Sequence, residues 1–122
     1  MNPQTVLVLE DDALIAELLT IDLEAMGLRV LGPAYNCSSA LELLLRDRPD
    51  FAILDTQLGP ETCESVLDQC TVLGIPIVIA SGHAASELPL FAVGLPLLRK
   101  PYLADDITAL VARIQPTNTQ PR

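Results

Sequence analysis

Short apolar runs alternate along this chain with longer stretches in which apolar residues recur at helical spacing. Unbroken apolar runs are typical of strands buried on both faces of a sheet. We expect strands at Thr5–Leu9, Arg29–Leu31, Phe51–Leu54, Ile77–Ala80 and Leu97–Leu98. We expect helices at Ala13–Met26, from the Asn36–Ser39 capping segment to Arg46, at Thr62–Leu73 and at Ala104–Ile114, with a weak candidate at Ala84–Val93. The alternation predicts an α/β fold, a doubly wound five-stranded parallel sheet.

The region before the last strand breaks the regular alternation. Pro89 lies inside the weak helical candidate, and a proline in a helix interior removes a hydrogen bond and clashes with the preceding turn. We therefore expect the fourth helix to be short or irregular.

The length of 122 residues suits one domain with a single core. The strand and helix pattern covers about residues 4–114, and the remaining residues, 115–122, are polar and contain proline. We expect one domain over 1–122, with 115–122 as a flexible tail.

The charge balance and the apolar content argue against a nucleic-acid partner and against a disordered chain. The chain has 16 acidic and 7 basic residues, which gives a net charge of −9, and half of its residues are hydrophobic. Such an apolar content argues against a disordered acidic tail. A nucleic-acid binder would need clustered Lys and Arg to neutralise phosphates, so we expect no nucleic-acid partner.

The N-terminus, the apolar segments and the cysteines indicate the cellular compartment of the protein. The N-terminus lacks the features of a secretory signal, and the most apolar stretch, 88–98, is too short and too interrupted to span a membrane. Cys37, Cys63 and Cys70 form no metal or disulfide pattern, and we interpret them as small buried hydrophobic residues. We expect a cytoplasmic protein with no membrane partner.

Most of the candidate chemistry follows directly after the strands. It comprises Glu10, Asp11 and Asp12 after the first strand, Asp55 after the third, Ser81 and His83 after the fourth, and Lys100 after the fifth. Ligands of an open parallel sheet bind beyond the carboxyl ends of its strands. We therefore expect these side chains to meet at one edge of the sheet.

Carboxylates gathered in this way repel one another unless a cation compensates their charge. Mg²⁺ with carboxylate and water ligands is the usual solution, and Lys100 adds a second positive charge. Such a site suits a phosphoryl group, and Asp55 is our candidate nucleophile, forming an acyl phosphate. Asp12 is better explained as a cap or first-turn acid of the first helix.

Four separated motifs then point to a family. VLVLEDD, FAILD, IVIASG and LLRKPY, in this order, resemble the receiver domain of bacterial response regulators over about residues 4–114. The resemblance implies a flavodoxin-like (βα)5 fold. It also implies that Asp55 accepts the phosphoryl group and that Mg²⁺ is held by Asp55, Asp11, Glu10 through water, and the backbone carbonyl of Gln57.

The resemblance implies roles for further residues near the fourth and fifth strands. Ser81 matches the switch hydroxyl that bonds a phosphoryl oxygen, and Lys100 matches the lysine that pairs with Asp55 or its phosphate. The Lys100–Pro101 bond is cis in the family. His83 is either a solvent-exposed loop residue or, together with Gln57, a modulator of the lifetime of the acyl phosphate.

The chain also departs from the family pattern. The switch position, usually aromatic, is Leu97, and the loop after Asp55 reads TQLGPETC without the common signals. These departures are similar to a divergent receiver subgroup in which the region before the last strand is mobile. We therefore expect signalling through order and disorder of 82–96 rather than through one ring rotation.

The leading functional hypothesis is a stand-alone response regulator. Asp55 would accept a phosphoryl group from a sensor histidine kinase or phosphotransfer protein, and output would be contact with a downstream protein. Such a protein is not an enzyme beyond slow self-dephosphorylation. Alternatives are an unphosphorylated pseudo-receiver adaptor and an aspartyl-phosphate phosphohydrolase. The first helix has more apolar residues than one buried face needs, which fits either a homodimer or partner surface, or burial under the terminal helix.

Overall fold

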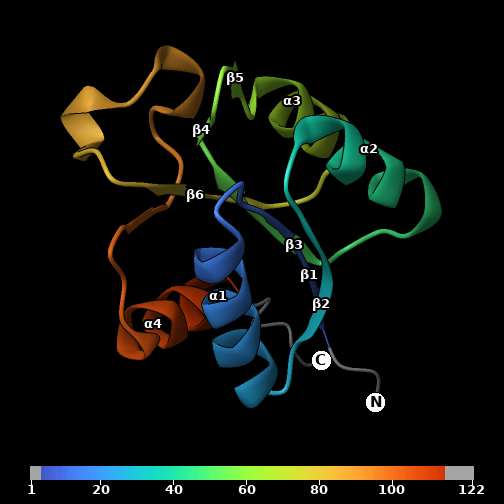
Figure 1. Cartoon of the computed structure of the whole chain (residues 1–122), viewed down its shortest axis with the longest axis vertical. Coiled ribbons are helices and arrows are strands. Elements are labelled where there is room, and N and C mark those ends of the chain that lie inside the picture. Colours follow the sequence, from blue (N-terminus) through green and yellow to red (C-terminus); the bar gives the residue numbers. More distant parts are fainter. Residues whose placement is uncertain (1–3, 115–122) are drawn as a thin grey trace, which may run out of the picture.

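The computed structural model describes residues 4–114 and contains a five-stranded parallel sheet (Figure 1). The sheet strands are β1 (Thr5–Leu9), β2 (Arg29–Ala34), β3 (Phe51–Asp55), β6 (Ile77–Ser81) and β7 (Leu97–Arg99). The helices are α1 (Ala13–Ala25), α2 (Cys37–Arg46), α3 (Glu64–Leu73) and α4 (Ala104–Ile114). A separate hairpin is formed by β4 (Gln57–Leu58) and β5 (Glu61–Thr62). The predicted doubly wound, flavodoxin-like fold is confirmed.

The strand order is β2-β1-β3-β6-β7, and every neighbouring pair is parallel. The chain runs outward from β1 to β2 on one side, then crosses back to β3 and continues to β7 on the other. In open parallel sheets, ligands bind beyond the carboxyl ends of the strands at such a reversal, which here lies between β1 and β3. The topology therefore places the candidate site at the ends of these two strands.

α2 and α3 cover one face of the sheet, and α1 and α4 cover the other (Figure 1). Residues of α2 and α3, among them Ala40, Val66 and Cys70, pack in one buried cluster with Leu7, Leu9 and Leu54 of the sheet. Residues of α1 and α4, among them Leu19, Leu23 and Ile107, pack in a second cluster with Val6, Val8 and Ile53. Successive side chains of a strand point to opposite faces, so the continuous apolar runs are explained by burial on both sides.

The helix boundaries follow local capping. The Asp12 carboxylate accepts hydrogen bonds from the backbone N–H groups of Leu14 and Ile15, at 3.0 and 3.1 Å, which confirms Asp12 as the N-cap of α1. Asn36 caps α2 in the same way through Ser39 N. α3 ends at Gly74, whose φ of 73° is the left-handed conformation that glycine adopts readily.

The three cysteines are free and buried, as the sequence suggested. Burial raises the pKa of the Cys63 thiol to about 12 and that of Cys70 to about 11. The pKa of Cys37 is also raised, again chiefly by burial. Thiols in such surroundings stay neutral and pack as small apolar groups.

The structure moves two predicted boundaries by two or more residues, shifts several others by one residue, and adds one element. β2 continues past Gly32–Pro33 to Ala34, and α3 begins at Glu64 rather than at Thr62 because Thr62 belongs to β5. The β4–β5 hairpin was not predicted. Between β6 and β7 the chain makes only two 3₁₀ turns, at Ala85–Glu87 and Leu90–Ala92, so the prediction of a short or irregular fourth helix is confirmed.

Within residues 4–114, no helix combines the length and the apolar character needed to cross a membrane. The predicted tail, 115–122, lies outside the described residues.

Candidate functional site

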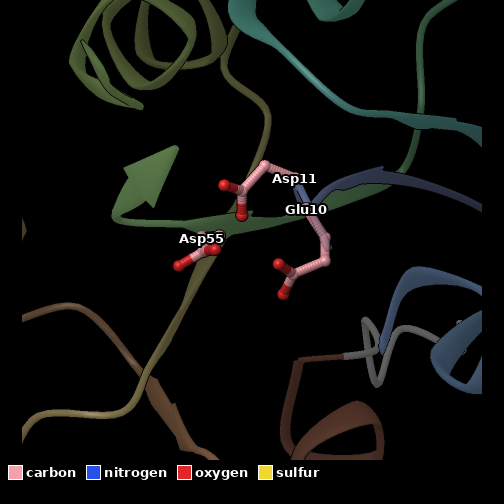
Figure 2. Close-up of side chains that lie close together, drawn as sticks. All are labelled: Glu10, Asp11 and Asp55. Carbon is pink, nitrogen blue, oxygen red and sulfur yellow. The ribbon is translucent and has the colours of Figure 1, made fainter. Parts of the chain in front are cut away.

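Three carboxylates meet beyond the ends of β1 and β3. Glu10 and Asp11 follow β1, and Asp55 is the last residue of β3. One carboxylate oxygen from each residue lies within 4.8 Å of the others. Figure 2 shows the three carboxyl groups turned toward a shared space. The structure therefore brings together the acidic residues that the sequence placed at this edge.

The three carboxylates differ in exposure. Glu10 is 2% and Asp55 5% exposed, whereas Asp11 is exposed. Glu10 is fixed by its backbone, since its N–H donates to Ala34 O of β2, and by its side chain, since Oε2 accepts from Asp12 N at 3.1 Å. The carboxylates of Glu10 and Asp55 are therefore buried in the site, whereas that of Asp11 is open to solvent.

The Lys100 side chain provides a positive charge beside the two buried carboxylates. Its ammonium donates to Asp55 Oδ2 at 3.1 Å and lies 2.6 Å from Glu10 Oε1. The backbone of Lys100 is anchored by its N–H, which donates to Ser81 O at 2.8 Å, and the following bond to Pro101 is cis. The Lys100 side chain is 18% exposed, so its contact with the carboxylates is mostly shielded from water.

The pKa values of these groups reflect burial and mutual charge. Burial raises the pKa of Glu10 to about 7; Asp55 adds to the rise, while Lys100 and Asp12 N–H oppose it. For Lys100, burial alone lowers the pKa, but the contacts with Glu10 and Asp55 outweigh it, and the net pKa is raised. The lysine therefore stays charged, whereas Glu10 titrates near neutrality in the metal-free protein.

The donor set fits a divalent cation with oxygen ligands. Three carboxylates face one ammonium, so the fully ionised cluster has a net charge of −2. Glu10 Oε1 is buried and lies 2.6 Å from the Lys100 ammonium, which also contacts Asp55. One lysine therefore has to compensate two buried carboxylates. Oxygen donors with a charge deficit are what Mg²⁺ requires.

Ser81 and His83 lie at the end of β6, next to β3. Ser81 is buried, and its hydroxyl oxygen accepts a hydrogen bond from His83 N at 3.0 Å. The His83 side chain is exposed and faces Glu87, with 3.9 Å between Nδ1 and Oε1. The structure thus places the Ser81 hydroxyl at the predicted edge, while the His83 side chain contacts Glu87 rather than the carboxylates.

Gln57 lies two residues past Asp55, at the start of β4. Its backbone N–H is 3.4 Å from Asp55 Oδ1, and its side-chain Nε2 donates to Gly59 O at 2.6 Å. The amide side chain is therefore engaged with the hairpin turn. The backbone of Gln57, rather than its side chain, is the part adjacent to the acidic cluster.

The switch position is occupied by an aliphatic residue, Leu97, rather than by an aromatic side chain that could rotate. Leu97 is the first residue of β7 and packs, partly buried, against the cluster formed with α2 and α3. Tyr102, two residues past Lys100, has a buried hydroxyl without a hydrogen-bond partner among the described residues. Burial, together with the charges of Glu10, Asp55 and Asp22, raises the pKa of Tyr102.

Sequence reasoning missed Tyr102 and the residues of the β4–β5 hairpin. Tyr102 lines a cavity of about 540 Å³ with Lys100, Ile15 and Leu18, between α1 and the start of α4. The Gly59–Pro60 pair marks a turn and could have suggested the hairpin. Tyr102 is the last residue of the LLRKPY motif, but the motif does not indicate that its side chain lines this cavity.

The chain is similar in sequence to a curated regulatory protein. No protein-family model matches the chain. The chain is 37% identical to the transcriptional regulatory protein CseB of Streptomyces coelicolor over 123 residues, 94% of this chain and 50% of that protein. The chain thus spans about half the length of CseB.

Solved structures extend the comparison. The CheY-like response regulator receiver domain of Methylobacillus flagellatus has a TM-score of 0.80 at 22% identity, covering 93% of this chain and 99% of that one. The response regulator TrrA of Thermotoga maritima, in complex with Mg²⁺ and BeF, has a TM-score of 0.77 at 22% identity, covering 91% and 98%.

The chain thus combines a β2-β1-β3-β6-β7 parallel sheet with an acidic cluster and a lysine at the carboxyl edge of the sheet. In its fold and in the placement of these residues, the chain is similar to response regulator receiver domains.

Proposed function

We propose that the chain accepts a phosphoryl group on Asp55 in a Mg²⁺-dependent reaction and passes the signal on through protein contacts. The observation that carries the proposal is the position of Asp55. Its carboxylate is buried at a strand end, 3.1 Å from the Lys100 ammonium and within 4.8 Å of Glu10 and Asp11. A carboxylate in this setting is a nucleophile surrounded by groups that stabilise phosphoryl charge.

The proposed step transfers the phosphoryl group from a phosphohistidine of a sensor kinase or phosphotransfer protein. A carboxylate oxygen of Asp55 forms the new bond to phosphorus, and the bond from phosphorus to the donor nitrogen breaks in line with it. The electron pair of the broken bond leaves with the imidazole, which takes up a proton. Asp55 then carries an acyl phosphate.

Each surrounding residue has a defined part in this proposal. Glu10, Asp11, Asp55 and the backbone carbonyl of Gln57 would hold Mg²⁺, which supplies positive charge to the phosphoryl oxygens. Lys100 already contacts Asp55 and would pair with the phosphate. Ser81 would turn its hydroxyl from acceptance of His83 N–H toward donation to a phosphoryl oxygen.

Two residues are proposed to modulate the lifetime of the acyl phosphate. Gln57 adjoins Asp55, and His83 follows Ser81 at the rim, held toward Glu87 in the structure. A His83→Ala variant should change the dephosphorylation rate of the acyl phosphate. An unchanged rate would leave His83 as an exposed loop residue only.

The pseudo-receiver and phosphohydrolase alternatives gain no support. A pseudo-receiver would lack Asp55 or its neighbours, and all of them are in place. The partners of this domain are proposed to be a sensor kinase or phosphotransfer protein and a downstream protein in the cytoplasm. The stand-alone organisation and the homodimer through the first helix stay predictions.

The site can be tested with Mg²⁺ and beryllofluoride, a phosphoryl analogue, by backbone NMR. We expect saturable shifts at the ends of β1, β3 and β6 with one beryllofluoride per chain, abolished in Asp55→Asn and in the absence of Mg²⁺. Asp68→Asn, an exposed aspartate on α3, is the matched control and should respond as the wild type. Shifts that persist in Asp55→Asn would contradict the assignment of Asp55.

A further inference from the structure

The β4–β5 hairpin follows Asp55 directly, with only Thr56 between them. Gln57 lies opposite Thr62 and Leu58 opposite Glu61, and the connection is the Gly59–Pro60 turn. Gly59 has a φ of 66°, in the left-handed region that glycine allows. The backbone proposed to contribute a metal ligand, that of Gln57, thus belongs to a small ordered element rather than to an open loop.

Two hydrogen bonds join the second strand of this hairpin to the first residue of α2. The backbone N–H of Cys37 donates to Glu61 Oε2 at 3.2 Å, and the Cys37 thiol donates to Thr62 O at 3.1 Å. The first N–H groups of a helix have no partner within the helix, and a carboxylate there also interacts favourably with the helix dipole. Glu61 therefore connects the hairpin to α2 through a charge-assisted contact.

The hairpin is held at its other side as well. Leu58 is buried in the cluster formed with α2 and α3, and Cys63 N donates to Thr56 O at 3.2 Å, which closes the segment behind Asp55. Gln57 lies between these two fixed points, and its side chain is occupied by Gly59 O. The position of the Gln57 backbone relative to Asp55 consequently depends on the hairpin and on its contact with α2.

We propose that Glu61 is a positioning residue for the Mg²⁺ site, acting through the hairpin backbone on Gln57. This inference rests on the proposed function. Glu61 itself is exposed, and its carboxylate is committed to the start of α2, not to the acidic cluster. Mg²⁺ demands near-ideal octahedral geometry. A hairpin released from α2 presents the Gln57 backbone less uniformly, and the cation is bound more weakly.

The test compares three variants with the wild type. Glu61→Ala removes the contact with Cys37, and Glu61→Gln keeps an oxygen acceptor in the same place. Glu64→Ala removes an exposed carboxylate three residues further on, whose side chain is not involved in the hairpin contacts. Mg²⁺ affinity is measured by NMR titration, amide exchange at Leu58 and Thr62 reports on the hairpin, and urea unfolding reports on the fold.

We expect Glu61→Ala to weaken Mg²⁺ binding about tenfold, the scale on which residues that orient a metal ligand act. Exchange at the hairpin amides should rise, while the rest of the sheet keeps its protection. Glu61→Gln should restore most of the affinity, and Glu64→Ala should bind Mg²⁺ as the wild type does. A merely structural role would lower the free energy of unfolding without changing Mg²⁺ affinity in the folded protein.

Two results would overturn the inference in different ways. Wild-type Mg²⁺ affinity in a folded Glu61→Ala protein removes the role of Glu61 and leaves the proposed function intact. A wild-type protein that binds no Mg²⁺ and accepts no phosphoryl group overturns the proposed function, and the role of Glu61 with it. If Glu61→Ala does not fold, Glu61→Asp takes its place, since it keeps the charge but shortens the reach to Cys37 N: weaker Mg²⁺ binding than in Glu61→Gln supports the inference, and wild-type affinity contradicts it.

Discussion

Glu10 carries the main electrostatic cost of the site. Its carboxyl group is buried beside Asp55, and its pKa is raised to about 7, chiefly by burial. The folded protein therefore holds a proton on Glu10 at pH values where the unfolded chain, in which the glutamate pKa is ordinarily 4.5, has released it. Ionising Glu10 in the metal-free fold costs free energy, which a bound cation would offset.

This shift predicts a pH dependence of stability. Because the folded state binds more protons than the unfolded state between the two pKa values, the free energy of unfolding falls as the pH rises through that window. In metal-free buffer we expect the wild type to lose on the order of 2 kcal/mol relative to Glu10→Gln between about pH 4.5 and pH 7. Urea unfolding of both proteins at several pH values measures this difference.

The control for this prediction is Glu17→Gln on the exposed surface of α1, which should follow the wild-type pH profile. Parallel profiles for the wild type and Glu10→Gln would show that the Glu10 carboxyl group titrates as it does in the unfolded chain.

At the level of elements, the start of α1 depends on one side chain. Asp12 accepts from two N–H groups of the first turn, and an N-cap of this kind contributes about 1 kcal/mol. Asp12→Ala should lower the free energy of unfolding by roughly this amount in metal-free buffer, as urea denaturation would measure. Asp12→Asn keeps the acceptor and should lie close to the wild type; equal losses in both variants would show that charge, not capping, matters.

The segment between β6 and β7 is the element with the least regular structure. It contains two 3₁₀ turns, and Leu90 and Val93 are among its exposed apolar residues. Such segments open at low free-energy cost, so they are suited to change on ligand binding. We expect amide exchange within 82–96 to change when Mg²⁺ and beryllofluoride are added. Equal exchange rates with and without the analogue would contradict a signalling role for this segment.

The elements that the sequence predicted well are those with a periodic signal. The runs at Phe51–Leu54 and Ile77–Ala80 are unbroken and apolar, and each forms most of a buried inner strand, β3 or β6. Gly32–Pro33 suggested the end of a strand, but β2 is an edge strand, where a proline costs less pairing. A two-residue strand has no periodicity, so β4 and β5 could not be found from the apolar pattern.

The same distinction holds for the site. Glu10, Asp55, Ser81 and Lys100 could be placed together because each follows a strand, and parallel strands end at one edge. The contact of Glu61 with Cys37 could not be predicted, since it joins residues 24 positions apart that no motif connects. The division of the Lys100 ammonium between Glu10 and Asp55 likewise depends on side-chain geometry that spacing does not reveal.

For the whole molecule, the net charge of −9 has two parts. Three carboxylates form the cluster at the sheet edge, and most of the others lie on the exposed surface. A phosphoryl group on Asp55 adds roughly one or two negative charges to the cluster. Under the proposed function, Lys100 and Mg²⁺ would together offset this charge, so Mg²⁺ dependence is the expected signature of the proposed reaction.

The proposal that Asp55 accepts a phosphoryl group is tested most directly by the intact mass of the protein after incubation with a small acyl phosphate donor. We predict that one phosphoryl group is added per chain, on Asp55, only when Mg²⁺ is present, and that Asp55→Asn gains none. Continued consumption of the donor at high turnover would indicate a phosphohydrolase. A wild-type protein that stays unmodified with Mg²⁺, or an Asp55→Asn variant that is modified equally, would contradict the account.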